Sequence, residues 1–438
     1  MALIVQKYGG SSVSDVEAIK RVAKRIVETR NAGHKLVVVV SAMGDTTDEL
    51  LDTAAQITDN APEREMDILL TAGERISMSL LSMAINELGV PAQAFTGAQA
   101  GIHTTSAYGR AQITGMVPER IARSISEGQV AIVAGFQGIS DNDDVTTLGR
   151  GGSDTTAVAL AAALHADVCE IYTDVDGLFS ADPRIVPKAH RLRSISTEET
   201  LELAAHGAKI LHLRAVEFAR RYKVPLHVRS SFSEKEGTWI SDRPASPALK
   251  GLVPDAAFLD PKEGKMEQPI ISGIAHDRGQ DKITVAGVPN HPGRAAMVFQ
   301  TIAAAGANID MIVQNIPVAD PTRANITFTI PEADAQVALD ALESAKEEIG
   351  FKEVRYNPNI GKLSLVGTGM RTNPGVAARL FAALSEAGIN IDLISSSEIR
   401  LSIVTKLDDL DRAVAVVHSA FGLDAEVSEA VVYAGTGR

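Results

Sequence analysis

The 438-residue sequence predicts an α/β protein, an open α/β sandwich followed by two ferredoxin-like α+β modules. Three observations predict this fold class. In residues 1–243, short β-branched runs alternate with longer helical patterns, as in a parallel sheet covered by helices. Residues 244–268 are rich in proline and predict a linker, and the remainder of the chain repeats itself. The two modules are expected at residues 269–350 and 361–438, the second with a C-terminal strand.

The first predicted strand, residues 3–6, leads through a glycine loop into an amphipathic helix. Ser14 and Glu17 have the spacing of a capping box, in which a hydroxyl and a carboxylate satisfy each other's backbone donors. Further strands of the same parallel sheet are expected at residues 36–40, 130–134, 168–173 and 226–228. Because ligands bind at the carboxyl ends of such strands, we expect ligand contacts at Lys7, Ser41, Phe136 and Thr173.

Two glycine-rich loops of the sandwich are suited to anions. Residues 147–154, Thr-Leu-Gly-Arg-Gly-Gly-Ser-Asp, run directly into an alanine- and leucine-rich helix. The glycines let backbone N–H groups approach a ligand, the helix N-terminus adds unpaired donors, and Arg150 offers a planar fork for a carboxylate or phosphate. Gly9 and Gly10 form a similar loop near the start of the chain. Two such loops in one α/β unit indicate a phosphate donor and an acidic acceptor.

The last third of the chain contains two copies of a Pro-Gly turn, a helix and an Asn-Ile-Asp motif. Pro292-Gly293 with residues 308–310 recurs as Pro374-Gly375 with residues 390–392. Each copy fits the β-α-β-β-α-β order of a ferredoxin-like module. The helix N-termini beside the Pro-Gly turns are suited to small carboxylates.

Composition restricts the class of protein. A net charge of −13 and a pI near 5.3 argue against nucleic acid or an anionic membrane as partner. The lone Cys169 cannot form an internal disulfide, which fits a reducing compartment. No stretch reaches the roughly 18 uninterrupted apolar residues of a spanning helix, and the N-terminal apolar run is too short for a signal peptide. The histidines lack metal spacing. We expect a cytoplasmic protein without a dedicated metal site.

Five motifs, in order along the chain, resemble the signatures of the aspartokinase family. They are KYGGSS at 7–12, SAMGDTT at 41–47, TAGER at 71–75, GFQG at 135–138 and TLGRGGSD at 147–154. The repeat resembles the paired ACT amino-acid-binding modules of that family, and the arrangement is similar to its actinobacterial lysine- and threonine-inhibited type. The resemblance implies an amino-acid-kinase-like sandwich. It also implies ATP-dependent phosphorylation of the β-carboxylate of L-aspartate to 4-phospho-L-aspartate, the first step of lysine, threonine and methionine biosynthesis.

The same resemblance implies roles for individual residues. Lys7 would contact the transferring phosphoryl group, Lys209 would be a second phosphate-facing lysine, and Asp154 would orient both lysines. The nucleotide, carrying Mg²⁺, is expected to contact Lys7, Tyr8, Gly9, Gly10, Ser41, Thr173, Asp174, Phe179, Asp182, Arg184 and Lys209.

For the L-aspartate substrate, the implied contacts are Thr47, Glu74, Phe136, Arg150 and Ser153. Arg150 and Ser153 would hold the α-carboxylate, and Glu74 would hold the ammonium group. The apolar residues 68–70 and the following Gly73 favour a position for Glu74 where a strand passes into a loop.

Lysine and threonine are the implied effectors of the two modules. They are expected to contact Asn290, Gly293, Asn308, Ile309, Asp310, Gln314, Asn373, Gly375, Asn390 and Asp392. The chain departs from the family pattern Gln-Asn-Val-Ser at residues 314–317, which here end in Pro317, without a backbone donor or a hydroxyl. Asn290 and Asn325 also stand where relatives often have aspartate. We therefore expect regulation to persist with weaker inhibition.

Two other functions remain open, another amino-acid kinase acting on acetylglutamate or glutamate, and a non-catalytic amino-acid sensor. The TAGER motif and the double repeat disfavour the first. The presence of Lys7, Arg150, Asp154 and Lys209 disfavours the second. Met266 lies between the linker and the first module, so an internal start there would yield a shorter regulatory chain. A homo-oligomer, or a hetero-oligomer with that shorter chain, is expected.

Overall fold

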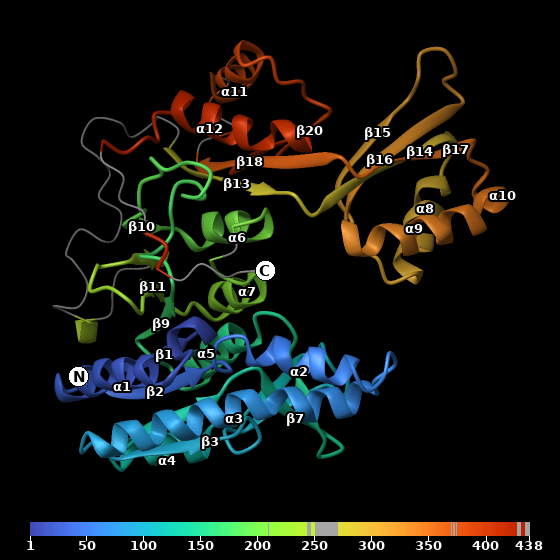
Figure 1. Ribbon diagram of the computed structural model, residues 1–438. Coiled ribbons are helices and arrows are strands. Elements are labelled where there is room, and N and C mark those ends of the chain that lie inside the picture. The colour runs from blue at the N-terminus through green and yellow to red at the C-terminus, as the bar shows by residue number, and fades with distance from the viewer. Residues whose placement is uncertain are drawn as a thin grey trace. The chain divides into compact units, whose positions relative to one another are not determined.

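The computed structural model describes residues 1–208, 210–242, 247–249, 270–368, 370, 373, 375–426 and 431–433 (Figure 1). The chain forms two compact units, Met1–Glu267 with Asp424–Arg438, and Gln268–Leu423. Most of the predicted linker 244–268, including Met266, lies outside the described residues, which there comprise only the short 3₁₀ turn Pro247–Leu249.

The main sheet of the first unit confirms the predicted α/β sandwich. Within the described residues its strand order is β10-β12-β11-β9-β1-β2-β6-β3. The strands are β1 (Leu3–Tyr8), β2 (Lys35–Val40), β3 (Ala92–Phe95), β6 (Val130–Ala134), β9 (Val168–Thr173), β10 (Ser194–Ile195), β11 (Leu226–Ser230) and β12 (Thr238–Ile240). The central strands are parallel and β12 is antiparallel to β11. All five strands predicted here are present.

Helices cover both faces of this sheet. On one face, Ile19 and Ile26 of α1 and Leu81 of α3 pack on Val38 and Ile132 of the strands. On the other, α5 contacts β1, β2 and β9, and α7 packs against α5 (Figure 1). The helices are α1 (Val16–Asn31), α2 (Thr46–Ala55), α3 (Glu63–Glu87), α4 (Glu119–Ser126), α5 (Gly152–Ala163), α6 (Thr197–Ala205) and α7 (Leu213–Tyr222).

A smaller sheet lies in the same unit and supports one of the glycine loops. Its order is β5-β4-β7-β8, and its strands are β4 (Ile102–Thr104), β5 (Ile113–Met116), β7 (Gln137–Ser140) and β8 (Val145–Thr147). Strand β8 leads directly into the loop that precedes α5.

The predicted capping box of Ser14 and Glu17 is wrong by one residue. The N-cap of α1 is Asp15, whose carboxylate accepts a hydrogen bond from the N–H of Ala18 at 2.9 Å. Residues Gly10–Val13 form a 3₁₀ turn that takes Ser14 as its last residue, so the helix begins after Asp15. A short carboxylate is a favoured N-cap, and its charge complements the helix dipole.

The second unit consists of two modules, each with a four-stranded sheet. The first has the predicted order, as β14 (Gln280–Pro289), α8 (Arg294–Ala304), β15 (Asp310–Asn315), β16 (Arg323–Pro331), α9 (Glu332–Ser344) with the short α10 (Lys346–Ile349), and β17 (Glu353–Asn357). The second contains β18 (Ile360–Thr368), α11 (Gly375–Glu386), β19 (Leu393–Ser396), β20 (Arg400–Lys406) with the short turn η3 (Leu407–Asp409), and α12 (Leu410–Ala420).

The predicted module boundaries are wrong at two places. Strand β13 (Ile270–Asp277), expected in the first module, pairs with β18 of the second, with Ile274 opposite Leu365. The first module is therefore inserted between two parts of the second. Strand β13 is the edge strand next to β18 in the second module's sheet. It therefore takes the position expected for the C-terminal strand of that module. Residues from Asp424 onward belong instead to the first unit.

Candidate active site

The carboxyl end of β1 carries an ion pair that joins two motifs far apart in sequence. The ammonium of Lys7 lies 2.7 Å from the carboxylate Oδ1 of Asp154, in the first turn of α5, and both side chains are largely buried. A Cβ on Gly9 would lie only 3.4 Å from that ammonium, so the glycine leaves the lysine accessible from the loop. The pair therefore places a fixed positive charge beside a glycine loop.

The two loops at the ends of β1 and β2 touch through their backbones. The N–H of Gly44 donates to the carbonyl of Gly10 at 3.1 Å, and a Cβ on Gly10 would lie 2.9 Å from the carbonyl oxygen of Gly44. The N–H of Ser41 donates to the carbonyl of Tyr8 at 3.1 Å. This packing explains why residue 10 is glycine, and it brings Tyr8 close to Ser41.

The loop before α5 has the conformation that its glycines allow. Gly149 and Gly151 have φ angles of +73° and +71°, and Gly151 is the N-cap of α5. A Cβ on Gly151 would collide with the ring of His212, at 2.0 Å. Arg150 between them is exposed, and Ser153 lies in the first turn of the helix. The positive end of a buried helix thus faces the same region as Lys7.

Glu74 lies within the long helix α3, so the predicted strand-to-loop position is wrong. Gly73 does not mark a break in the chain but a contact point, because a Cβ there would lie 2.7 Å from the Cβ of Ala42. The Glu74 side chain is buried and accepts a hydrogen bond from the N–H of Ala42 at 3.1 Å. Burial raises its pKa to about 7. Its second oxygen, Oε2, has no hydrogen-bond partner among the residues that the structure describes, so this buried carboxylate is suited to an ammonium ligand.

Phe136 adopts a left-handed backbone, with a φ of +69°, where β6 ends. Its N–H donates to the hydroxyl of Thr156 at 3.2 Å and its carbonyl accepts from the N–H of Leu148 at 2.8 Å. Positive φ is rare for a bulky residue and is stored strain that often marks a functional site. A Cβ on the preceding Gly135 would lie 2.6 Å from the hydroxyl of Ser153, so this turn packs directly on the start of α5.

The predicted nucleotide segment begins at the end of β9. The Thr173 hydroxyl donates to the carboxylate of Asp174 at 3.0 Å. Further along, Asp182 and Arg184 form a two-pronged ion pair, with distances of 3.0 and 2.8 Å. Phe179 is buried.

Two further residues, Thr47 and Lys209, were expected at the aspartate and phosphate sites. Thr47 lies half-buried in the first turn of α2. Lys209 lies outside the described residues.

Asp67 is a supporting residue that sequence reasoning missed. It lies on α3 with 1% of its surface exposed, and its carboxylate accepts from the N–H and the hydroxyl of Thr147 at 2.8 and 2.6 Å. It also accepts from the N–H of Gly109 at 2.9 Å. These bonds fix β8 where it enters the Gly149–Gly151 loop. A lone aspartate in an apolar helical run was the only signal for it.

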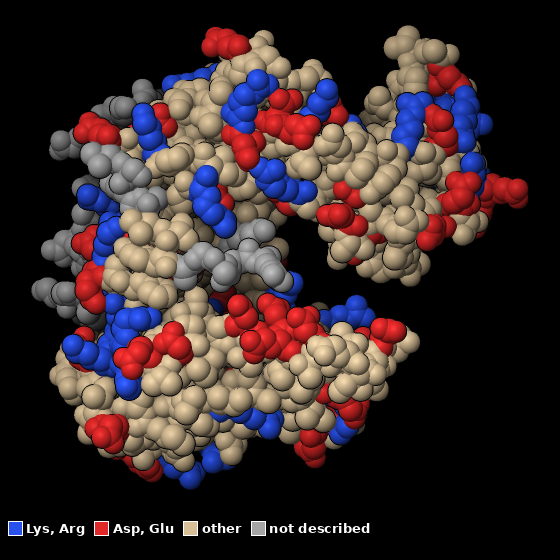
Figure 2. Space-filling model, in the orientation of Figure 1, with Lys and Arg blue, Asp and Glu red and all other residues tan. Residues whose placement is uncertain are grey.

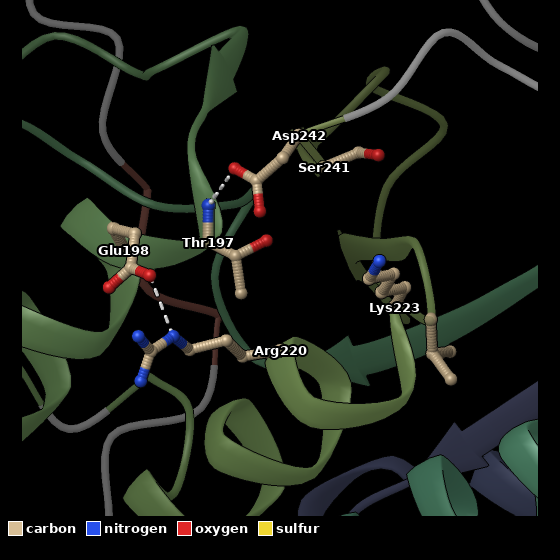
Figure 3. A pocket seen from close by; sticks show the side chains of 7 residues that line it. Thr197, Glu198, Arg220, Lys223, Ser241 and Asp242 are labelled. Atoms are coloured by element: carbon tan, nitrogen blue, oxygen red, sulfur yellow. Dashed lines mark hydrogen bonds and ion pairs between the residues drawn. The ribbon is translucent and has the colours of Figure 1, made fainter.

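A pocket of about 370 Å³ lies away from these loops (Figure 3). It is lined by Thr197, Glu198, Arg220, Lys223, Val224, Ser241 and Asp242. The Glu198–Arg220 ion pair at 2.7 Å and the bond from the Thr197 N–H to Asp242 satisfy several of its polar groups. It flanks the start of β11, whereas the glycine loops flank the carboxyl ends of the parallel strands.

On the face shown in Figure 2, Lys and Arg side chains are interspersed with Asp and Glu rather than gathered into a basic patch. Within the part of the chain that the structure describes, no group of three or more His, Cys, Asp or Glu could hold a metal ion.

Within the described ranges, one helix, α3, is long and apolar enough to cross a membrane by length and composition. It packs against α1, α2, β3, β6 and β8, and it carries the buried carboxyls of Asp67 and Glu74. These contacts identify it as a core helix of the first unit.

Comparisons with known proteins agree with the fold and the motifs. Residues 2–230 match the amino acid kinase family, and residues 283–345 and 363–421 match the ACT domain. The chain is 58% identical to an aspartokinase of Mycolicibacterium smegmatis over the full length of both chains.

Among solved structures, it is similar to E. coli aspartokinase III in complex with aspartate and ADP in the R-state. The TM-score is 0.78 at 25% identity, covering 96% of this chain and 100% of the other. The T-state structure of the same enzyme with lysine and aspartate gives a TM-score of 0.68 at 25% identity, covering 95% and 99%.

Proposed function

Since the chain belongs to the aspartokinase family, a kinase family that phosphorylates aspartate, we propose that its transfer site is the region around the Lys7–Asp154 ion pair. ATP would deliver its γ-phosphoryl group there to the β-carboxylate of L-aspartate, giving 4-phospho-L-aspartate. The observation that carries this proposal is the 2.7 Å contact between Lys7 and Asp154, beside two glycine loops and a helix N-terminus.

The reaction needs charge stabilisation more than a general base. A carboxylate is already a nucleophile at neutral pH, and the difficulty is to bring it to a triphosphate. The Lys7 ammonium offsets charge that spreads over the γ-oxygens, and Asp154 holds that ammonium in position. Lys209, as a second lysine, would add to the same charge.

The nucleotide fits the loops at the ends of β1, β2 and β9. Gly9 leaves the space that a Cβ would fill next to the Lys7 ammonium, which supports a phosphate there. The proposed contacts are Tyr8, Gly9, Gly10, Ser41, Thr173, Asp174, Phe179, Asp182 and Arg184. Mg²⁺ carried by the nucleotide would neutralise part of the phosphate charge. A complex of the E. coli relative with ADP supports nucleotide use.

Aspartate is held by groups of opposite charge at its two ends. The exposed Arg150 fork takes the α-carboxylate, together with Ser153, and the buried Glu74 takes the ammonium. Thr47 and Phe136 complete the contacts. This arrangement leaves the β-carboxylate to face Lys7.

Regulation by end-product amino acids is assigned to the two ACT modules. The proposed effectors are lysine and threonine, and the complex of the E. coli relative with lysine supports the first. Gly293 (φ +94°) begins α8 and Gly375 begins α11, so each module offers a helix N-terminus to a carboxylate.

The assembly and the compartment are also part of the proposal. The active form would be a homo-oligomer or a hetero-oligomer with a shorter chain starting near Met266, in the cytoplasm. Expression of the native coding region with a C-terminal tag tests the second form, which predicts two tagged chains. A single tagged band without proteolysis would exclude it.

A coupled kinase assay tests the proposed substrate. Aspartate, glutamate and acetylglutamate are compared as acceptors, with and without lysine and threonine. Turnover with aspartate alone, inhibited by at least one effector, supports the proposal. Preference for either other acid, or no turnover at all, would refute it.

A further inference from the structure

The end of the chain returns to the catalytic unit after the second ACT module. Helix α12 ends at Ala420, and Asp424 already pairs with Ala189 of the first unit through a β-bridge. The N–H of Ala425 also donates to the carbonyl of Lys188 at 2.8 Å. Only residues 421–423 separate this anchor from the last regulatory helix.

The last described residues of the chain bind the proposed nucleotide segment itself. Val432 forms an antiparallel bridge with Val175, and the N–H of Tyr433 donates to the carbonyl of Asp174 at 3.0 Å. The piece is drawn in red near β11 in Figure 1. Asp174 directly follows Thr173 at the end of β9, so this hydrogen bond holds the backbone at the entrance of the nucleotide segment.

The side chain of Tyr433 adds a second tie, through Asp176. That carboxylate is 1% exposed and accepts from the Tyr433 hydroxyl at 3.3 Å, the Lys235 ammonium at 2.8 Å and the Ser233 hydroxyl at 2.5 Å. A buried carboxylate requires such donors, since leaving it unpaired is costly. Asp176 therefore links the nucleotide segment both to the loop after β11 and to the described C-terminal residues 424–426 and 431–433, here called the tail.

The aromatic ring and the opposite side of the segment complete the arrangement. The Tyr433 ring stacks on Phe232 with centroids 5.9 Å apart and planes 13° apart. From the sheet side, the N–H of Leu178 donates to the hydroxyl of Thr238 at 2.8 Å. A Cβ on Gly177 would lie 2.5 Å from that hydroxyl. Residues 174–178 are thus held between β12 and the tail.

We propose that Tyr433 is a positioning residue for ATP, acting through the backbone of Asp174 and the carboxylate of Asp176. The inference rests on the proposed role of residues 173–184 in nucleotide binding. It gives residues 424–426 and 431–433 a structural role in the catalytic unit, although they follow the last regulatory helix in sequence. Loss of the tail should leave the aspartate site intact, because its residues Arg150, Glu74 and Ser153 lie on other elements.

Kinetics of the full-length enzyme and four variants test this role. The variants are Tyr433→Ala, Tyr433→Phe, a chain ending at residue 430, and Val431→Ala as a matched control at an exposed neighbour. Tyr433→Ala loses the hydroxyl bond to Asp176 and the ring contact with Phe232, and the truncation also loses the N–H bond to Asp174; each should raise the KM for ATP about tenfold. The KM for aspartate and the kcat should change little. Tyr433→Phe keeps the ring but loses the hydroxyl bond to Asp176, so its KM for ATP should lie between those of the parent and Tyr433→Ala, and Val431→Ala should match the parent.

Three outcomes would overturn the inference. They are an unchanged KM for ATP in both Tyr433→Ala and the truncation, equal increases for ATP and aspartate, and a lower melting temperature without a change in either KM. The variant Arg184→Ala distinguishes a wrong role for Tyr433 from a wrong assignment of the nucleotide segment. If Arg184→Ala raises the KM for ATP while the tail variants do not, only the role of Tyr433 is wrong. If none of these variants changes it, the nucleotide segment itself is wrongly assigned.

Discussion

Replacing Asp310 by alanine should destabilise the regulatory unit more than the equivalent change at Asp392. The two aspartates occupy the same place in the two Asn-Ile-Asp motifs, and each binds a lysine of the other module. Asp310 pairs with Lys362 of β18 at 2.7 Å, and Asp392 pairs with Lys282 of β14 at 2.6 Å. The repeat therefore contains its own matched control.

The difference in cost follows from burial. The Lys362 side chain is 1% exposed, whereas that of Lys282 is 20% exposed. Asp310→Ala leaves a buried ammonium without its carboxylate, which in fully buried pairs costs about 3–5 kcal/mol. Because Asp310 is itself 38% exposed, solvent screens part of the attraction, and we expect about 2–3 kcal/mol. For Asp392→Ala, with both partners partly exposed, about 1 kcal/mol is expected.

Calorimetry of the full chain measures this difference in the transition of the regulatory unit. For a unit of this size, the costs correspond to roughly 4–12 °C for Asp310→Ala and roughly 2–4 °C for Asp392→Ala. Adding Lys362→Met to Asp310→Ala should recover much of the loss, since it removes the unpaired buried charge. Equal decreases for the two alanine variants, or no recovery in the double variant, would refute the reasoning.

Three further predictions concern the proposed ligands. Because burial raises the pKa of Glu74 to about 7, this carboxyl ionises as pH rises through 7, and the KM for aspartate should fall over that range. Glu74→Gln should raise the KM for aspartate about tenfold or more and remove most of its dependence on pH. The folded protein holds a Glu74 proton that the unfolded chain releases, so stability should decline between about pH 4.5 and 7 in the parent and less in the variant, as followed by melting temperature. Arg150→Lys should raise the KM for aspartate far more than that for ATP, because an ammonium cannot reproduce a two-pronged hold; equal increases would contradict this. Pro317→Ser should tighten inhibition by lysine and threonine while uninhibited turnover stays nearly unchanged, and superimposable inhibition curves would exclude position 317 as the determinant.

Local sequence patterns were sufficient to predict the sandwich and the part of the site that glycine loops define. Continuous apolar runs mark buried parallel strands, and the carboxyl ends of such strands meet at one edge, which brings Lys7 close to Asp154. Gly9, Gly10 and Gly151 signal close approaches that the structure contains.

Features that depend on long-range pairing could not be predicted from local patterns. Gly73 was interpreted as a break, but it is glycine because α3 approaches Ala42 there. The pairing of β13 with β18 is specified by a sheet edge more than 80 residues away in sequence, which periodicity does not encode. The buried Asp67 acts through Thr147, a partner equally distant along the chain. In each case the contact that determines the structure joins residues much farther apart in sequence than the few residues from which a helix or strand pattern is recognised.

The turnover of Lys7→Ala tests the central claim most directly, namely that the Lys7–Asp154 pair lies at the point of phosphoryl transfer. The production of 4-phospho-L-aspartate is measured at saturating ATP and aspartate for the parent, Lys7→Ala and the control Lys20→Ala, at an exposed lysine that forms an ion pair with its helix neighbour Glu17. We predict that Lys7→Ala lowers kcat by about two orders of magnitude or more, the scale of a lost transition-state charge, with normal turnover in the control. Because Lys7→Ala also leaves the largely buried Asp154 carboxylate without this ammonium, its melting temperature should fall, and turnover is measured well below it. A correctly folded Lys7→Ala enzyme with near-parental kcat would contradict the account.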